Sequence, residues 1–184
     1  MIPALIFVIQ AFAHLYLLVL LLRFWLPWFG ADFRNPIAQG ILRLTSPAVN
    51  PVRRFLPSLG RVDTATVVIA FAIQYLTVLT VETLRGATPD IGMIAVLSLF
   101  ELASMTLRLF MYAIFIRIIL SWFAPQTYNP ATALLATITD PLLRPFRRYI
   151  PPMGGFDISP IFAIILLGAL SVLLAELQIS LLPR

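Results

Sequence analysis

The sequence predicts an all-α membrane protein whose four transmembrane helices form two parallel tandem repeats. Of its 184 residues, 60% are hydrophobic and 11% are charged, and the mean hydropathy is +0.96. A soluble domain has roughly 45–50% apolar residues and about 25% charged ones, because much of its surface contacts water. Uncharged runs long enough to span a bilayer recur along the chain, and its second half repeats the motifs of its first. These observations exclude a soluble enzyme and a disordered segment.

The residue inventory argues against catalysis. The chain has no cysteine, a single histidine, His14, and no lysine, so all 13 of its basic residues are arginines. Without these residues it has no thiolate nucleophile, no Schiff-base lysine and no histidine cluster within one chain. We therefore expect a protein that is not an enzyme and that has no cofactor, metal site or catalytic residue. The net charge of +5 is assigned to membrane orientation and anionic lipid, not to nucleic acid.

Four segments match the length of about 20 mostly apolar residues that a hydrocarbon core about 30 Å thick requires. The first begins the chain and carries no ionised side chain before Arg23. The second and fourth each begin directly after an aspartate and stay uncharged up to a glutamate. The third is longer, and ionisable residues interrupt it. The predicted helices are residues 2–24, 64–84, 95–122 and 158–181.

The distribution of arginine predicts the orientation in the membrane. The first basic residue, Arg23, follows the first apolar run, which is the reverse of the order in a cleavable signal peptide. Segments 23–63 and 117–157 hold ten of the 13 arginines. Because cytoplasmic loops carry an excess of arginine, we expect both long connections in the cytoplasm and both termini outside.

A shift of 94 residues superposes the two halves without a gap. Within residues 23–63, 14 of 41 positions are identical to their counterparts, among them arginine, tryptophan, asparagine and proline. We therefore divide the chain into repeats at 1–90 and 91–184. An even number of crossings per repeat makes the repeats parallel, unlike the inverted repeats of many transporters. The motif comprises Arg23, Asn35, Pro36, Pro47, Pro51 and Asp63 in the first repeat, and Arg117, Asn129, Pro130, Pro141, Pro145 and Asp157 in the second.

Each connection between the helices of a repeat is rich in arginine and proline. Asparagine followed by proline, at Asn35 and Asn129, is typical of a helix N-cap with proline in the first turn. Ser46-Pro47 and Asp140-Pro141 repeat the pattern, so we expect two short interfacial helices per connection, each ending near the next proline. Paired arginines recur in both connections and predict contact with headgroups or a partner protein, although setting topology and bracing the loops is the competing interpretation. These arginines are Arg53, Arg54, Arg147 and Arg148.

Four polar residues fall within the predicted spans, where such residues are costly and often functional. His14 and Arg108 occupy equivalent repeat positions, each nine residues before the boundary arginine and so near mid-membrane. Gln74 lies at a similar depth and is a candidate partner for His14. Glu101 lies two turns before Arg108, and a structural pair of Arg108 with Glu101 or Glu176 is favoured over a role in permeation. Trp28 and Trp122 are expected at the water interface.

The twice-repeated Arg…Asn-Pro…Thr-(Ser/Asp)-Pro-x-x-x-Pro-x-Arg-Arg pattern resembles the YggT family of bacterial membrane proteins, whose relatives include the YlmG proteins. The resemblance covers nearly the whole chain, although Asp63-Thr64-Ala65-Thr66 departs from the pattern that Asp157-Ile158-Ser159-Pro160 follows. It implies an integral protein of the bacterial cytoplasmic membrane. It also implies links to osmotic tolerance, ion uptake, membrane organisation at division or plastid cytochrome assembly, and it brings no catalytic residues.

Two functions from different classes are therefore in competition. The first is a non-enzymatic organiser that presents two arginine- and proline-rich faces to the cytoplasmic leaflet. Its partners would be anionic lipid headgroups and other membrane proteins, with a homo-oligomer left open. The second is a component of an ion or solute pathway with a polar centre at His14, Gln74, Glu101 and Arg108. A continuous polar path through the bilayer would favour the second function.

Overall fold

The computed structural model describes residues 1–88, 90–123, 129–150 and 157–181, and the part described is built from α-helices without a β-strand. Four helices are long and apolar enough to cross a membrane, namely α1, α3, α4 and α6. The predicted fold class is therefore confirmed. The six helices are α1 (Ile2–Trp28), α2 (Pro36–Arg53), α3 (Thr64–Leu84), α4 (Ile91–Phe123), α5 (Pro130–Tyr149) and α6 (Ser159–Leu181).

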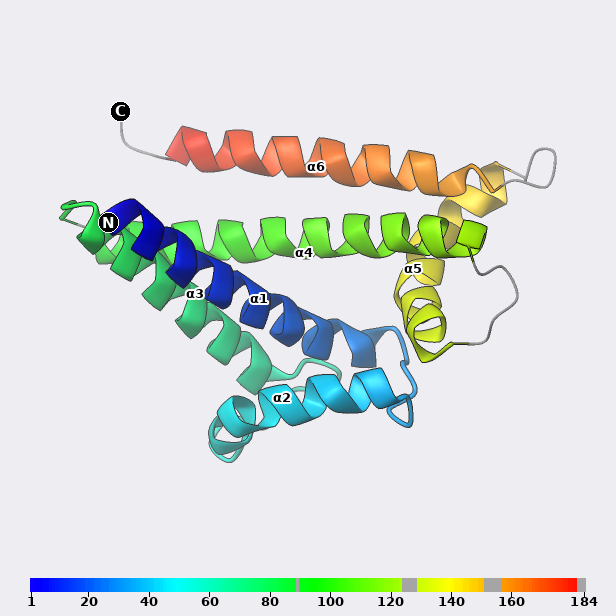
Figure 1. The fold of residues 1–184 in the computed structure, drawn as a ribbon, viewed down its shortest axis with the longest axis horizontal. Coiled ribbons are helices and arrows are strands. Elements are labelled where there is room, and N and C mark those ends of the chain that lie inside the picture. The colour runs from blue at the N-terminus through cyan, green and yellow to red at the C-terminus, as the bar shows by residue number, and fades with distance from the viewer. Residues whose placement is uncertain (89, 124–128, 151–156, 182–184) are drawn as a thin grey trace.

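The four long helices pack as two hairpins that meet along one seam. Helix α1 packs against α3, and α4 packs against α6, so each repeat forms its own hairpin. Helix α3 packs against α4 and joins the hairpins, which cross at an angle (Figure 1). Helix α6 contacts α4 and α5 and leaves most of its surface exposed. Such exposed apolar surface is what a helix facing lipid requires.

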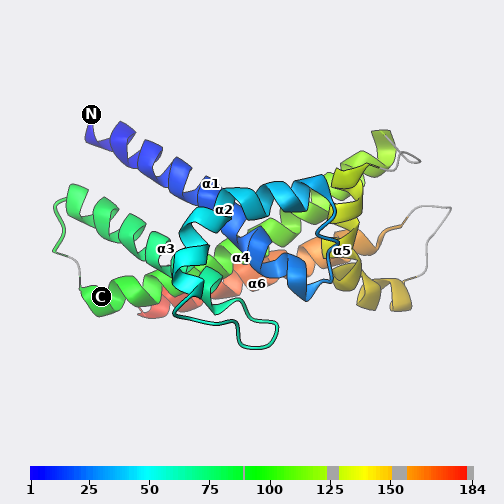
Figure 2. The ribbon, with the colours of Figure 1, turned by 90° about the horizontal axis from the view of Figure 1, so that it is seen from below.

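Helices α2 and α5 lie at the same end of the long helices and contact each other there (Figures 1 and 2). The start of α1, the α3–α4 turn and the end of α6 lie at the opposite end (Figure 1). Each connecting helix also packs against both long helices of its own repeat. The two arginine-rich connections therefore belong to one face of the molecule.

A glycine with positive φ follows the C-terminal end of each long helix in the first hairpin, α1 and α3. Gly30, with φ +69°, follows α1, and Gly86, with φ +79°, follows α3. In each case the next amide donates back to a carbonyl in the last turn, Ala31 N–H to Leu26 O at 3.0 Å in the first. This arrangement is the common glycine-terminated helix end. It explains why α1 continues to Trp28, four residues past the predicted limit.

Each connection forms one continuous helix, and the prediction of two short helices per connection is wrong. The internal prolines Pro47 and Pro51 lie inside α2, and Pro141 and Pro145 lie inside α5. Proline in a helix removes one hydrogen bond and costs about 3 kcal/mol or more. The ribbon of α2 changes direction along its length, as a proline-containing helix is expected to do (Figure 2).

Burial of one continuous face outweighs this cost. In α2 the buried residues follow helical spacing across the proline at position 47, and in α5 they cross the proline at position 141. A break at either proline would turn part of that face away from the long helices. Asparagine caps at both helix starts add to the stability, since Asn35 accepts from Ile37 N at 2.8 Å and Asn129 from Ala131 N at 3.0 Å. The buried faces are Ala38, Ile41, Thr45 and Val49 in α2, and Leu134, Ile138, Thr139 and Leu143 in α5.

Candidate functional site

In each repeat, the motif residues form an ion-pair cluster where the three helices of that repeat meet. The first cluster centres on Arg23, which lies near the end of α1 and is 3% exposed. Its Nη1 donates to Thr45 Oγ1 at 2.7 Å and to Ser46 Oγ at 3.3 Å, both on α2. The Thr45 hydroxyl donates in turn to the Ile41 carbonyl at 2.6 Å. One buried guanidinium thus fastens α2 to α1.

Asp63, the N-cap of α3, supplies the negative charge of the first cluster. Its Oδ2 lies 3.6 Å from Arg23 Nε and forms an ion pair with Arg53. It also accepts from Thr66 Oγ1 at 2.7 Å. Burial raises the pKa of Asp63, but the hydrogen bond from Thr66 and the charge of Arg53 outweigh burial and hold the pKa below its ordinary value. Asp63 is therefore ionised at neutral pH and is shared by two arginines.

The second cluster uses the equivalent positions with one more carboxylate. Arg117 Nη1 donates to Thr139 Oγ1 and to Asp140 Oδ1, both at 2.6 Å. Arg147 donates to Asp140 Oδ1 at 2.9 Å through Nη1 and to Asp157 Oδ2 at 2.8 Å through Nε. Asp140 stands where the first repeat has Ser46. Two arginines and two aspartates therefore alternate through the cluster.

The charges of the second cluster stabilise one another. Burial raises the pKa of Asp140, but hydrogen bonds from Arg117 and Arg147 lower it to a net value below the ordinary one. Burial also raises the pKa of Asp157, and hydrogen bonds from Ser159 and Arg147 lower it further than burial raises it. The pKa of Arg147, which burial lowers, is raised overall by its two aspartates. Both carboxylates are ionised at neutral pH.

The arginine at the centre of the second cluster is more exposed than its counterpart in the first cluster. The Arg117 side chain is 27% exposed, against 3% for Arg23. A cavity of about 590 Å³ between α4, α5 and α6 reaches the second cluster. Arg117, Arg147 and Asp157 form its polar wall, and its other walls are mainly apolar. An amphiphile with a charged group would match this combination of walls.

The paired arginines of the connections divide into two kinds. The first arginine of each pair belongs to a cluster. Arg53 forms an ion pair with Asp63, and Arg147 forms ion pairs with Asp140 and Asp157. Arg54 and Arg148 are exposed and make no ion pair among the described residues. In each pair, the first arginine is held inside its own repeat and the second one faces outward.

The asparagine of the first repeat also joins the two repeats. The Asn35 Nδ2 donates to the Pro130 carbonyl at 2.7 Å, next to the N-cap of α5. Its own Oδ1 remains the cap acceptor of α2. This bond contributes to the contact between α2 and α5 and fixes their starts relative to each other.

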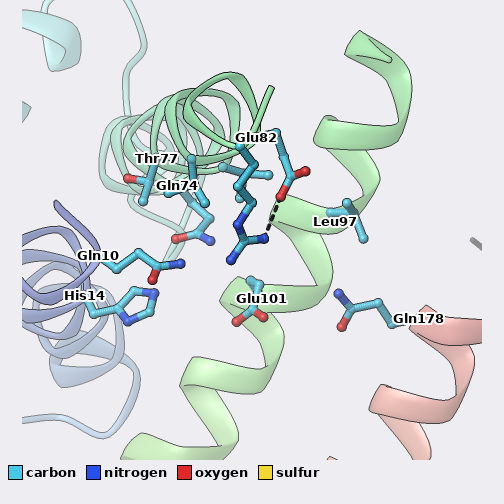
Figure 3. A pocket seen from close by; sticks show the side chains of 11 residues that line it. Gln10, His14, Gln74, Thr77, Glu82, Leu97, Glu101 and Gln178 are labelled. Atoms are coloured by element: carbon cyan, nitrogen blue, oxygen red, sulfur yellow. Dashed lines mark hydrogen bonds and ion pairs between the residues drawn. The ribbon is translucent and has the colours of Figure 1, made fainter. Parts of the chain in front are cut away.

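A second group of polar side chains lies between the long helices, at the end of the molecule opposite α2 and α5. A cavity of about 250 Å³ opens between α1, α3, α4 and α6. Figure 3 shows Gln10, His14 and Gln74 gathered on one side of it, with Glu101 between them and Gln178. Three of the four polar residues predicted within the spans therefore line one cavity, and Gln74 lies near His14 as the common depth suggested. The complete lining is Gln10, His14, Gln74, Thr77, Val78, Val81, Glu82, Arg85, Leu97, Glu101 and Gln178.

The fourth predicted residue, Arg108, does not line this cavity. Its side chain is 50% exposed, and its Nη2 lies 3.9 Å from Glu101 Oε2. The cavity lining ends at the level of His14 and Gln74, and the next turns of α1 toward α2 are filled by the buried Leu17, Leu20 and Leu21. The four residues therefore do not form one polar path.

Two further lining residues, Gln10 and Gln178, have sequence positions that could have marked them. Gln10 lies one helical turn before His14 within a run that has no other amide. Gln178 lies two residues after Glu176, near the end of α6. Trp28 lies at the end of α1, whereas the side chain of Trp122 and residue Arg184 lie outside the described residues.

Four apolar helices of membrane-spanning length, joined at one end by two arginine-rich helices, define a multi-pass membrane protein with a tandem repeat. The CCB3/YggT family model matches this chain twice, at residues 2–84 and 96–178. The chain therefore belongs to the CCB3/YggT family, as its motifs suggested.

Two of the relatives match most of the chain. It is 41% identical over 172 residues to an uncharacterised protein of Pseudomonas aeruginosa, which is 92% of this chain and 87% of the relative. It is 32% identical over 170 residues to the uncharacterised protein YggT of Escherichia coli K12, covering 92% and 88%. A shorter stretch of 57 residues is 46% identical to the chloroplastic YlmG homolog protein 2 of Arabidopsis thaliana, covering 29% and 21%. No solved structure matches the chain.

Proposed function

We propose that the chain is a non-enzymatic membrane protein that organises the membrane by binding anionic phospholipid headgroups along α2 and α5. One observation carries this proposal. In each repeat, an aspartate fixes the first arginine of the pair, and the second, Arg54 or Arg148, is exposed without an ion-pair partner among the described residues. A role confined to bracing the connection would account for the first arginine but not for the second.

The chemistry of arginine supports a phosphate ligand. A guanidinium presents a rigid fork of donors that matches two phosphate oxygens, whereas an ammonium presents a point charge. Helices α2 and α5 bury one face against the long helices, and Arg54 and Arg148 remain exposed at their C-terminal ends. Each arginine near an anionic surface contributes about 1 kcal/mol, or roughly a five-fold change in affinity.

The proposal assigns this end of the molecule to the cytoplasmic leaflet of the bacterial inner membrane, in accord with the excess of arginine. Single-cysteine labelling tests the orientation because the chain has no cysteine of its own. With a membrane-impermeant maleimide applied from outside, Thr88→Cys is expected to react and Asn50→Cys is expected not to. Reaction of Asn50→Cys alone from that side would contradict the orientation.

Tryptophan quenching tests the binding itself. The three tryptophans stand at positions 25, 28 and 122, in the last turns of α1 and α4, and so at the end that carries α2 and α5. In phosphatidylcholine bilayers, brominated phosphatidylglycerol is expected to quench them more strongly than brominated phosphatidylcholine does. The Arg54→Ala/Arg148→Ala variant is expected to lose this preference, and the double lysine variant to restore part of it.

A second double variant serves as the matched control. Arg43→Ala/Arg144→Ala removes two exposed arginines from the same helices, at positions that the repeat does not share. It is expected to keep most of the preference for phosphatidylglycerol. Equal losses in both double variants would mean that net charge alone attracts the lipid. An unchanged preference in the Arg54/Arg148 variant would overturn the proposal and leave a protein partner as the candidate ligand of these arginines.

A further inference from the structure

The polar cavity at the end opposite α2 and α5 has features of a binding site, and the lipid proposal does not use them. It extends from Glu82 and Arg85, at the end of α3, down to Gln74. Eight residues separate Gln74 from Glu82, which corresponds to about 12 Å along a helix axis. Apolar side chains, among them Val78 and Leu97, complete its walls. The deep end of the cavity therefore lies about two helical turns inside the end of α3.

Gln74 is the strongest evidence for a ligand. The residue is 2% exposed, and its Oε1 is buried without a hydrogen-bond donor among the described residues. An unsatisfied buried acceptor costs about 1–3 kcal/mol. Gln74 lines the cavity, and its amide, turned by about 180°, would present this oxygen to a ligand there that has positive charge or a donor group.

The charges that face the cavity favour a cation. Glu82 is neutralised by Arg85, whose Nη1 lies 3.0 Å from Glu82 Oε1. Glu101 forms an ion pair with Arg108 at 3.9 Å, which is longer than a hydrogen bond, and Arg108 is not part of the lining. Two carboxylates and one guanidinium therefore face the cavity, together with His14 and neutral amides and a hydroxyl. The lining carries one negative charge in excess when His14 is neutral.

We infer that this cavity binds a monovalent alkali cation, with Gln74 Oε1 and the Glu101 carboxylate as its principal ligands. The amide oxygens of Gln10 and Gln178 and the Thr77 hydroxyl supply further neutral oxygens around the same space. A hard cation takes oxygen ligands, and a divalent ion is usually held by more than one carboxylate. Of the two lining carboxylates, Glu101 has the more distant guanidinium, at 3.9 Å against 3.0 Å for Glu82, and that guanidinium lies outside the lining, so a single positive charge matches the cavity. The inference concerns the opposite end of the molecule and does not depend on the lipid proposal.

Thermal unfolding of the purified full chain in detergent micelles tests the inference. The melting temperature is measured in NaCl, KCl and choline chloride at equal ionic strength, with choline as the cation too large for the cavity. One alkali cation is expected to raise Tm by about 3–6 °C over choline at roughly ten times its Kd. Gln74→Leu and Glu101→Gln are expected to lose this difference, even where their Tm in choline chloride changes.

Two further variants make the outcome specific. Glu176→Gln neutralises an exposed carboxylate on α6 that does not line the cavity, so it is expected to keep the full alkali effect. Gln74→Glu places a second carboxylate at the deep end and is expected to enlarge the effect. An equal Tm of the wild type in all three salts would overturn the inference, as would an alkali effect that persists in Glu101→Gln. Stabilisation by glycine in choline chloride, without an alkali effect, would instead identify a zwitterion site.

Discussion

The two repeats use the same motif to lock three helices together, but they balance its charge differently. In the first repeat, Asp63 is shared by Arg23 and Arg53, and the cluster is closed around a guanidinium that is 3% exposed. In the second, Asp140 joins Asp157, so that each arginine has a carboxylate at 2.9 Å or less. The additional aspartate accompanies a cluster that opens to a cavity. The shared residues therefore hold the helices of each repeat together, and the exchange of Ser46 for Asp140 changes which carboxylates the arginines contact.

The largest difference between the repeats is expected in the free energy of unfolding that is lost when an aspartate of each cluster is replaced. Asp63→Asn leaves Arg23 buried without a carboxylate among the described residues, and loss of one partner of a buried pair costs about 3–5 kcal/mol. Asp157→Asn leaves Arg147 bonded to Asp140 in a half-exposed site, where a pair contributes below about 1 kcal/mol. The free energy of unfolding in mixed micelles measures both. Equal losses in the two variants would show that the first cluster is no more dependent on one carboxylate than the second.

One substitution, Ser46→Asp, should give the first cluster the additional carboxylate that the second cluster has. Ser46 Oγ lies 3.3 Å from Arg23 Nη1, and its counterpart Asp140 accepts from Arg117 at 2.6 Å. Added to Asp63→Asn, the change Ser46→Asp is therefore expected to recover about 1.5–3 kcal/mol, the contribution of a hydrogen bond between charged groups. Ser46→Asn in the same background is the matched control, since it has nearly the same shape without the charge. Equal recovery by both variants would assign the effect to shape and not to charge.

Acid should weaken the clusters of both repeats. The pKa values of Asp63, Asp140 and Asp157 lie below their ordinary values in the folded chain. A lowered folded-state pKa means stability that is present above the unfolded value, about 3.9 for aspartate, and lost as the pH falls through the folded value. The unfolding free energy of the wild type is therefore expected to decrease below about pH 4. Asp63→Asn and the Asp140→Asn/Asp157→Asn variant should each flatten this decrease, because each removes carboxylates whose pKa is lowered in the folded chain.

The membrane-spanning helices could be predicted from uncharged runs, but where each helix begins and ends depends on nearby capping groups. The second span was predicted at residues 64–84, which are the bounds of α3. Helix α4 begins at Ile91, four residues before the predicted 95, and the Asp90 carboxylate accepts from Met93 N at 2.9 Å beside that start. The prolines misled the prediction of the connections, because the packing of a continuous buried face is a tertiary effect that proline spacing does not reveal.

The site residues were only partly readable for a related reason. Depth along each helix was sufficient to associate His14 with Gln74, and the repeat alignment was sufficient to select Arg23, Asp63 and their counterparts. The side of a helix that faces its neighbours was not readable, because a span that is apolar all round has no amphipathic face. Arg108 was therefore grouped with Gln74, although it lies outside the cavity. The ion pair of Arg53 with Asp63 was not readable either, because Asp63 lies ten residues further along and across a turn.

The smallest difference between the repeats is expected in the free energy of unfolding that is lost when the buried threonine of each cluster is replaced. Thr45 and Thr139 are both fully buried, and each hydroxyl accepts from the arginine and donates to a carbonyl four residues earlier. Valine keeps the shape of threonine and removes both bonds. The lost carbonyl bond is common to the two sites, so the comparison isolates the bond to arginine.

After Thr139→Val, Arg117 keeps its 2.6 Å bond to Asp140, so the loss should be about 0.5–1.5 kcal/mol, the net contribution of an ordinary hydrogen bond. After Thr45→Val, Arg23 keeps only the 3.3 Å contact with Ser46, a marginal 3.5 Å bond to the Leu42 carbonyl and the 3.6 Å approach to Asp63. The loss there should be about 1.5–3 kcal/mol, as for a bond to a charged group that is not replaced. Unfolding in mixed micelles measures both losses, with Thr45→Ser and Thr139→Ser as controls that keep the hydroxyl. A larger loss at Thr139 than at Thr45 would reverse the order of the two clusters and contradict the view that the additional aspartate supports Arg117.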